Sequence, residues 1–155
     1  MAVPSIGKKV PDFTLPATGG EMVRLSELRG APVVLYFYPK DDTPGCTLEG
    51  QDFRDQAPAF RKLKAVVLGV SRDTLGSHER FKAKHELNFD LLSDSDEKLC
   101  HAFGVIKDKN MYGRKVRGIE RSTFLIDTEG VLRREWRGVK VKGHVAEVLE
   151  SLRQL

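Results

Sequence analysis

One stretch decides the fold of this chain: Val33-Val34-Leu35-Tyr36-Phe37-Tyr38-Pro39-Lys40-Asp41-Asp42-Thr43-Pro44-Gly45-Cys46. Its first six residues are apolar, β-branched or aromatic, which predicts a buried strand that ends at Pro39. A polar turn follows. Thr43 then predicts a helix start, because threonine is a good N-cap and proline suits the first helical position. Cys46 is therefore expected in the first turn of a helix that begins directly after a core strand.

The predicted position of Cys46 is typical of a reactive thiol. Free backbone N–H groups and the positive end of the helix dipole both favour the thiolate over the thiol. Asp41 and Asp42 oppose ionisation by like charge, and Lys40 offsets them only partly. We therefore expect an activated Cys46 to need a further cation from elsewhere in the chain. A buried structural thiol is the alternative, but the strand, turn and cap before Cys46 favour a functional one.

The rest of the chain predicts strands and helices around this unit. Apolar alternation predicts a small hairpin over 12–16 and 22–25, and the run 65–71 predicts a second buried strand. Helices are expected after Cys46, over 77–85, 95–104 and 144–155, with Pro58 ending, kinking or restarting the first. A short strand is expected over 89–92, a basic exposed excursion over 105–118, and a hairpin over 122–127 and 131–137. This order predicts an α/β fold, a thioredoxin-like mixed β-sheet flanked by helices with an N-terminal β-hairpin, as one domain over 1–155.

Composition narrows the class of protein. The chain has 155 residues, 40% hydrophobic and 31% charged, as in a soluble globular domain. No stretch approaches the ~18 consecutive apolar residues of a membrane helix, and residues 1–5 lack a secretion signal. The two cysteines are 54 residues apart without a Cys-x-x-Cys, which argues against a disulfide framework and a structural zinc site. We therefore expect a cytoplasmic protein without a membrane partner.

The net charge of +4 does not by itself indicate nucleic-acid binding. Basic residues are interleaved with acidic ones and are densest over 107–117 and at Lys140 and Lys142. No recognition helix, zinc finger or aromatic RNA-binding motif accompanies them. The sequence therefore favours a solvated basic surface, with no nucleic-acid partner.

The segment PKDDTPGC fits the pattern Pro-x-x-x-Thr/Ser-x-x-Cys of the peroxiredoxins. Phe37-Tyr38-Pro39-Lys40 and Thr43-Pro44-Gly45-Cys46-Thr47 resemble the bacterioferritin-comigratory, or Q-type, branch of that family. Downstream, Gly118-Ile119-Glu120-Arg121-Ser122-Thr123-Phe124-Leu125-Ile126-Asp127 resembles the segment that brings the family's active-site arginine. The likeness extends from about Gly7 to the C-terminus. It implies the thioredoxin-like fold and a thiol-dependent peroxidase.

The resemblance implies four active-site positions: Pro39, Thr43, Cys46 and Arg121. A peroxidase must hold the peroxide in line with the sulfur and stabilise the charge on the departing oxygen. The Thr43 hydroxyl and backbone N–H groups near Gly45 and Cys46 can donate to peroxide oxygens, and glycine at position 45 keeps the approach path open. Pro39 can shield the sulfur from water.

Arg121 is the candidate for the missing cation, because its fork of donors can hold thiolate and peroxide together. Sequence alone leaves open a surface ion pair with Glu120 or Glu135. Substrate binding is thus assigned to Gly45, Thr43 and Arg121. We expect no metal, haem or flavin cofactor, since the four histidines lack metal-ligand spacing.

The predicted reaction reduces hydrogen peroxide and small organic hydroperoxides as Cys46 passes through sulfenic acid. Many Q-type relatives carry a resolving cysteine five residues after the peroxidatic one, or in the next helix. Gln51 and, by alignment, Lys82 occupy these places here. A one-cysteine cycle is therefore expected, with thioredoxin, glutaredoxin or glutathione as the external reductant.

Three alternatives stay open. Cys100 resolves Cys46 if local unfolding brings the sulfurs within ~2 Å bonding distance, although beside Leu99 and Phe103 it is more typical of a core-edge residue. A thiol–disulfide oxidoreductase on the same fold is disfavoured by the lack of a nearby second cysteine. A redox sensor or holdase would use the oxidation of Cys46 to change a partner interaction. Nothing in the sequence requires more than a monomer.

Overall fold

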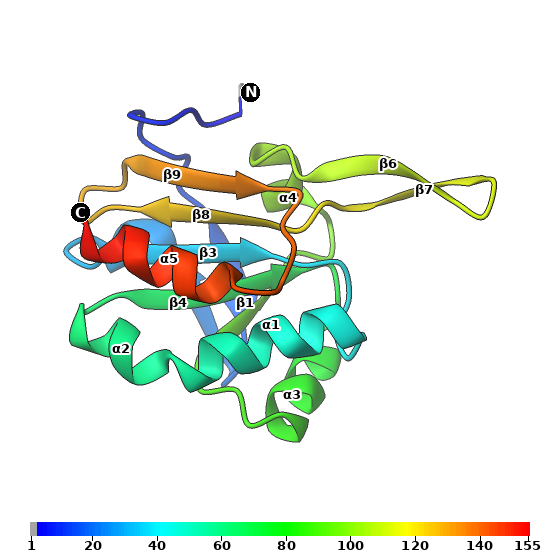
Figure 1. The fold of residues 1–155 in the computed structure, drawn as a ribbon, viewed down its shortest axis with the longest axis horizontal. Helices are drawn as coiled ribbons and strands as arrows, with labels where there is room; N and C mark the ends of the chain where they lie inside the picture. The colour runs from blue at the N-terminus through cyan, green and yellow to red at the C-terminus, as the bar shows by residue number, and fades with distance from the viewer. Residues whose placement is uncertain (1–2) are drawn as a thin grey trace.

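The computed structural model describes residues 3–155, apart from the side chains of residues 109 and 111. A seven-stranded mixed sheet forms its centre, in the order β2-β1-β5-β4-β3-β8-β9 (Figure 1). The strands are β1 (Thr14–Ala17), β2 (Glu21–Arg24), β3 (Val33–Phe37), β4 (Val66–Ser71), β5 (Asp90–Ser93), β8 (Ser122–Ile126) and β9 (Leu132–Arg137). The helices are η1 (Leu25–Leu28, 3-10), α1 (Pro44–Asp55), α2 (Ala57–Lys62), α3 (Leu75–Lys84), α4 (Lys98–Ala102) and α5 (His144–Arg153). None of the helices in the described part is long and apolar enough to cross a membrane.

Strand β3 is an interior strand of the sheet, with a partner on each side. It runs parallel to β4 and antiparallel to β8, and all five of its residues are buried. A strand buried on both faces needs apolar residues throughout, which explains the uninterrupted apolar run. The register pairs Phe37 with Ser122, so β8 begins beside the end of β3.

The sheet separates two hydrophobic cores, and alternate residues of β3 contribute to each. Leu35 and Phe37 belong to the first core, whereas Tyr36 and Tyr38 belong to the second. Successive side chains of a strand point to opposite faces, so this alternation is required. Helices α1, α2 and α5 cover the face of the second core (Figure 1).

The main predicted elements are confirmed, with different bounds. The N-terminal hairpin, the two buried strands and the terminal hairpin form as expected. Pro58 restarts the helix: α1 ends at Asp55, and Pro58 lies in the first turn of α2. Helix α3 begins two residues earlier than predicted because the Thr74 hydroxyl caps it, accepting from the N–H of Ser77 at 3.2 Å. Helix α4 is shorter than the predicted 95–104.

The basic excursion over 105–118 is exposed as predicted, but it is regular. Strands β6 (Ile106–Met111) and β7 (Arg114–Ile119) form a separate two-stranded antiparallel sheet. Tyr112 and Gly113 join them with φ angles of 52° and 78°, as the two positive values of a type I′ turn require. The strands lack apolar alternation because neither face of most of the ribbon is covered. Periodicity therefore could not reveal them.

Candidate active site

Cys46 lies in the first turn of α1, where the chain leaves β3. Its side chain is 2% exposed and belongs to the second core. The loop before it turns at Asp42, whose φ of 58° lies in the left-handed region that aspartate tolerates better than most residues. The N–H groups of Gly45 and Cys46 belong to the helix turn that has no intrahelical acceptors. The predicted strand–turn–helix around the thiol is therefore present.

Thr43 is the N-cap residue of α1, but its side chain does not cap the helix. The predicted N-cap position is therefore confirmed, without a capping hydrogen bond from the side chain. The hydroxyl instead donates to the carbonyl oxygen of Lys40 at 2.8 Å, which closes the active-site loop. Because the hydroxyl hydrogen is used there, the oxygen of Thr43 presents lone pairs that can accept from an approaching O–H.

The structure brings Arg121 to Cys46 from the start of β8, the strand next to β3. Its Nη2 donates to the Cys46 Sγ at 3.4 Å, and its Nη1 donates to the Glu49 Oε1 at 2.7 Å. Arg121 arrives here because it directly precedes Ser122, which is paired with the end of β3. Its backbone carbonyl accepts from the N–H of Val139 at 3.0 Å. The alternative ion pairs with Glu120 or Glu135 are not formed.

Glu49 is the site residue that sequence reasoning missed. It is fully buried in α1, three residues after Cys46, and residues three apart share a helix face. That spacing was the available signal. Burial raises the pKa of Glu49 to about 7, although Arg121 opposes the rise. Its Oε2 has no hydrogen-bond partner within the described residues, so the carboxylate is only half satisfied.

The charge of Arg121 is secured by its two partners. Burial disfavours a charged guanidinium, but Glu49 and Cys46 outweigh burial and raise the pKa of Arg121 above its usual range. Its side chain is 15% exposed, so one edge can reach a bound molecule. Arg121 thus places beside the Cys46 sulfur the further cation that the sequence led us to expect.

Gly45 has a steric role beside this cluster. A Cβ atom at position 45 would lie 3.0 Å from the Nη2 of Arg121. Any larger side chain would therefore push against the same nitrogen that contacts the sulfur. Contact with Arg121 is therefore a reason for glycine at position 45, whereas its role in the approach of peroxide stays a prediction.

Asp41 and Asp42, the two acids of the loop before Cys46, are held by hydrogen bonds and ion pairs to other groups. Asp41 is buried and accepts from the hydroxyls of Tyr38 at 2.6 Å and Ser77 at 2.8 Å. His78 lies 2.7 Å from Asp41 through Nδ1. Asp42 pairs with Lys84 at 2.8 Å and is also bonded to the ring of His85. These contacts fix the loop that positions Thr43.

Asp41, Asp73 and His78 also place potential metal ligands within 4.8 Å of one another. The Oδ2 of Asp73 accepts from the N–H of Asp41 at 2.9 Å and from the hydroxyl of Ser71. The second ring nitrogen of His78 lies 2.9 Å from the carbonyl oxygen of Leu92. Hydrogen bonds within the protein thus account for this cluster.

Cys100 lies away from this site. It is fully buried in the first core, whereas Cys46 belongs to the second core. Both cysteines are free. Burial and the neighbouring Asp94 raise the pKa of Cys100 far above its usual range. Cys100 is therefore the protonated, inert type of thiol.

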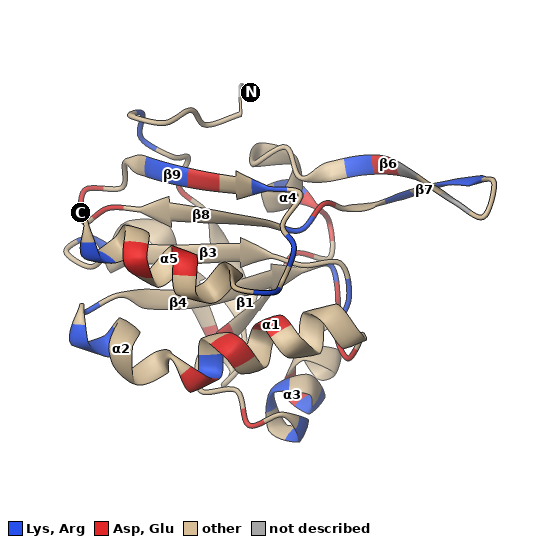
Figure 2. Cartoon of the chain, in the orientation of Figure 1, with Lys and Arg blue, Asp and Glu red and all other residues tan. Residues whose placement is uncertain are grey.

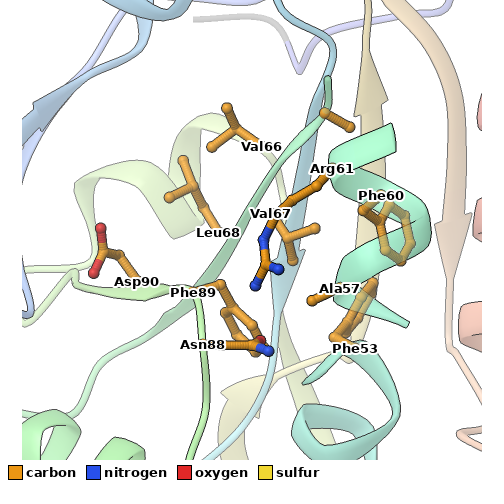
Figure 3. Close-up of a pocket in the computed structure, with 11 residues that line it drawn as sticks. Phe53, Ala57, Phe60, Arg61, Val66, Val67, Leu68, Asn88, Phe89 and Asp90 are labelled. Atoms are coloured by element: carbon orange, nitrogen blue, oxygen red, sulfur yellow. The ribbon is translucent and has the colours of Figure 1, made fainter. Parts of the chain in front are cut away.

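An apolar cavity of about 200 Å³ lies near the opposite end of α1 from Cys46 (Figure 3). Phe53, Phe60 and Phe89 form much of its wall, and Arg61 lies beside them. None of the four predicted active-site residues lines it. It is thus separate from the thiol site.

Removal of the Glu49 carboxylate is expected to change how stability depends on pH. The folded-state pKa of about 7 exceeds the ordinary value of 4.5, so the folded protein binds more protons between these values. The stabilisation associated with Glu49 is complete below about pH 4.5 and is lost as the pH rises through about 7. Glutamine at position 49 does not ionise. Between about pH 4.5 and 7, the free energy of unfolding of Glu49→Gln should therefore fall less than that of the wild type, by roughly a few kcal/mol.

Urea unfolding at about pH 5 and about pH 8 measures this difference. Glu79→Gln, in an exposed side chain on α3, is the matched control and should follow the wild type. Parallel stability curves for the wild type and Glu49→Gln would contradict the raised pKa of Glu49.

The chain is similar to known proteins over nearly its whole length. The AhpC/TSA family model matches residues 6–135. Peroxiredoxin Bcp of Bacillus subtilis is 55% identical over 150 residues, covering 97% of this chain and 96% of that protein. A mutant of Xanthomonas campestris peroxiredoxin Q has a TM-score of 0.88 and 53% identity, over 92% of this chain and 90% of its own. A mutant of Xylella fastidiosa PrxQ has a TM-score of 0.94 and 46% identity, over 99% of this chain and 98% of its own.

These neighbours confirm the thioredoxin-like mixed sheet predicted from the order of elements. They also agree with the motif around Cys46, because they are named for the family that the motif indicated. The chain belongs to the AhpC/TSA family and is a peroxiredoxin, a thiol peroxidase, of the bacterioferritin-comigratory or Q type.

Proposed function

We propose that the protein reduces hydrogen peroxide and small organic hydroperoxides in a one-cysteine cycle carried by Cys46. The contact of the Arg121 Nη2 with the Cys46 Sγ at 3.4 Å is the observation that carries the proposal. A bacterioferritin comigratory protein of Xanthomonas campestris, 52% identical to this chain, has been solved in work on its alkyl peroxide reduction activity. That relative supports organic hydroperoxides as substrates.

The thiolate of Cys46 attacks the terminal oxygen of the hydroperoxide. A sulfur–oxygen bond forms as the oxygen–oxygen bond breaks, and the departing oxygen takes a proton to leave as water or an alcohol. Arg121 stabilises the charge on the sulfur before attack and on the departing oxygen during it. Thr43 accepts from the peroxide O–H, while the N–H groups of Gly45 and Cys46 donate to its oxygens. Pro39, half-buried at the start of the loop, limits access of water.

An external thiol then reduces the sulfenic acid. Two thiols convert it to the Cys46 thiol and water and become a disulfide. Thioredoxin, glutaredoxin and glutathione supply such thiols, in a reducing compartment such as the cytoplasm. The protein acts as a monomer and needs no metal or organic cofactor for this chemistry.

The positions of the cysteines support an external rather than an internal reductant. The Xanthomonas campestris structures include serine mutants at two cysteines, numbered 48 and 84 in that protein and so 36 residues apart. The residue 36 positions after Cys46 is Lys82, whose ammonium group is 3.0 Å from Asp90. Cys100 is fully buried in the other core. A disulfide between Cys46 and Cys100 would require the sheet between them to open.

One equivalent of peroxide should add one oxygen to the reduced protein, at Cys46. Dimedone, which reacts with sulfenic acids, should trap this product, and intact mass and peptide mapping measure it. Cys100→Ala should give the same product, because Cys100 takes no part. Loss of two hydrogens with a peptide joining Cys46 to Cys100 would assign Cys100 as the resolving cysteine. An unmodified Cys46 would contradict the peroxidase cycle.

A further inference from the structure

The net charge of the protein is concentrated in one small part of the chain. Residues 106–119, which form the β6–β7 ribbon, contain five basic residues and one acidic residue. Their formal charge of +4 equals that of the whole protein, so the remaining residues sum to zero. Figure 2 shows this as basic positions along both strands of the ribbon, with a single acidic position on β6.

The ribbon extends away from the body of the molecule (Figure 1). It forms its own two-stranded sheet, separate from the seven-stranded one. Lys107, Arg114 and Lys115 are exposed and have no ion pair among the described side chains. Asp108, the single acid, is opposite Arg117 across the strands. The ribbon therefore presents uncompensated positive charge, with Arg114 and Lys115 next to the turn at its outer end.

The base of the ribbon is anchored, which fixes its direction. Ile119 is fully buried in the first core. Both terminal nitrogens of Arg117 contact Glu97, the N-cap residue of α4, at 2.7 Å, and Arg72 reaches the same carboxylate at 3.0 Å. Arg117 and Arg72 lower the pKa of Glu97 to about 2. A two-stranded ribbon is marginally stable by itself. The ion pairs of Glu97 with Arg117 and Arg72, together with the buried Ile119, therefore hold the base of the ribbon and set its orientation.

The base of the ribbon joins the seven-stranded sheet beside the active site. Only Glu120 separates the end of β7 from Arg121, and Arg121 contacts the sulfur of Cys46. Strand β8, which follows, begins beside the end of β3. A macromolecule held by the ribbon is therefore directed to the end of the sheet where Cys46 lies.

We propose that the β6–β7 ribbon is a docking arm for an acidic dithiol protein that reduces oxidised Cys46. The inference rests on the proposed one-cysteine cycle. Small thiols reach a sulfenic acid by diffusion, whereas a protein must be oriented so that its own cysteine meets the sulfur. Complementary charge supplies that orientation and raises the association rate. The reaction is Cys46 sulfenic acid plus dithiol protein giving the Cys46 thiol, the protein disulfide and water.

The composition of the ribbon favours a protein over other polyanions. Single-stranded nucleic acid binds on aromatic stacking platforms, and Tyr112 is the one aromatic residue of residues 106–119. A membrane surface requires an apolar face beside the basic one, and among the described side chains of the ribbon the large exposed apolar ones are Tyr112 and Val116. Its outer strand edges also leave backbone groups open to a protein partner.

Charge reversal in the ribbon tests this docking. The variant is Arg114→Glu with Lys115→Glu, and the matched control is Arg61→Glu with Lys62→Glu, two exposed residues on α2. Sulfenic acid is formed with peroxide, and its reduction is timed by stopped flow with a reduced thioredoxin of acidic pI or with dithiothreitol. At low salt, reversal in the ribbon should slow reduction by thioredoxin about 10- to 100-fold, and about 0.5 M salt should narrow that gap. Reduction by dithiothreitol and oxidation by peroxide should be unchanged.

Binding separates this proposal from the peroxidase cycle. Cys46→Ser protein, with and without the ribbon reversal, is titrated with the same thioredoxin by calorimetry at low salt. Loss of binding with the ribbon reversal, but not with the α2 control, supports the docking arm even if no sulfenic acid forms. Equal binding or equal reduction rates for both charge-reversed variants would overturn it. Stronger ribbon-dependent binding to an RNA oligonucleotide or to anionic phosphatidylserine vesicles would also overturn it.

Discussion

Cys46→Ser is expected to lower the second-order rate constant for hydrogen peroxide by at least about 1,000-fold, because removal of a covalent nucleophile leaves only background reaction. Serine has nearly the shape of cysteine, and the side chain at position 46 is 2% exposed, so the fold should be retained. The hydroxyl is not ionised at neutral pH and cannot replace a thiolate as attacking group. Competition with a peroxide-reactive dye measures the rate constant, and circular dichroism checks the fold.

Cys100→Ala is the matched control for Cys46→Ser. Cys100 is fully buried in the first core, so its loss should lower the free energy of unfolding but leave the rate constant for peroxide within about twofold. A larger fall in rate with Cys100→Ala, at a temperature where the variant is folded, would contradict the assignment of all peroxide chemistry to Cys46. Retained activity in Cys46→Ser would contradict it directly.

The features predictable from sequence were those that depend on neighbouring residues. The apolar run of β3, the turn after it and the helix start at Pro44 are local, and together they place Cys46. Arg121 is 75 residues further along the chain, and no local pattern connects it to the thiol. Its place was predicted only because its segment resembles that of a known family. Nonlocal contacts of this kind depend on strand register, which the sequence alone does not specify.

Two groups of polar residues were missed because their sequence context is ordinary. Glu49 resembles a solvent-facing helix acid, yet the structure buries it against Arg121. Asp41 resembles a loop acid that would repel the thiolate, yet it accepts hydrogen bonds from Tyr38 and Ser77. In both cases a partner from a distant segment, Arg121 for Glu49 and Ser77 for Asp41, helps to decide the role of the charge.

Arg121→Ala is expected to lower the rate constant for peroxide by about 100- to 1,000-fold, the usual effect of removing one donor that stabilises developing charge. The substitution removes the contact at 3.4 Å from the sulfur and the donor for the departing oxygen. It also leaves Glu49 buried without a cation, so the pKa of Glu49 should rise further and the group should become neutral. A loss of stability should therefore accompany the loss of rate.

Variants at the two ends of the ion pair separate the catalytic effect of Arg121 from the structural one. Arg121→Lys keeps a charge but lacks the planar fork that reaches the Cys46 sulfur and the Glu49 carboxylate at once, so it should recover only part of the rate. Arg121→Ala combined with Glu49→Gln removes the uncompensated carboxyl group and should regain stability without regaining rate. If the double variant recovered rate along with stability, Arg121 would act by holding Glu49. If its rate stays low, Arg121 acts on the sulfur and the peroxide themselves.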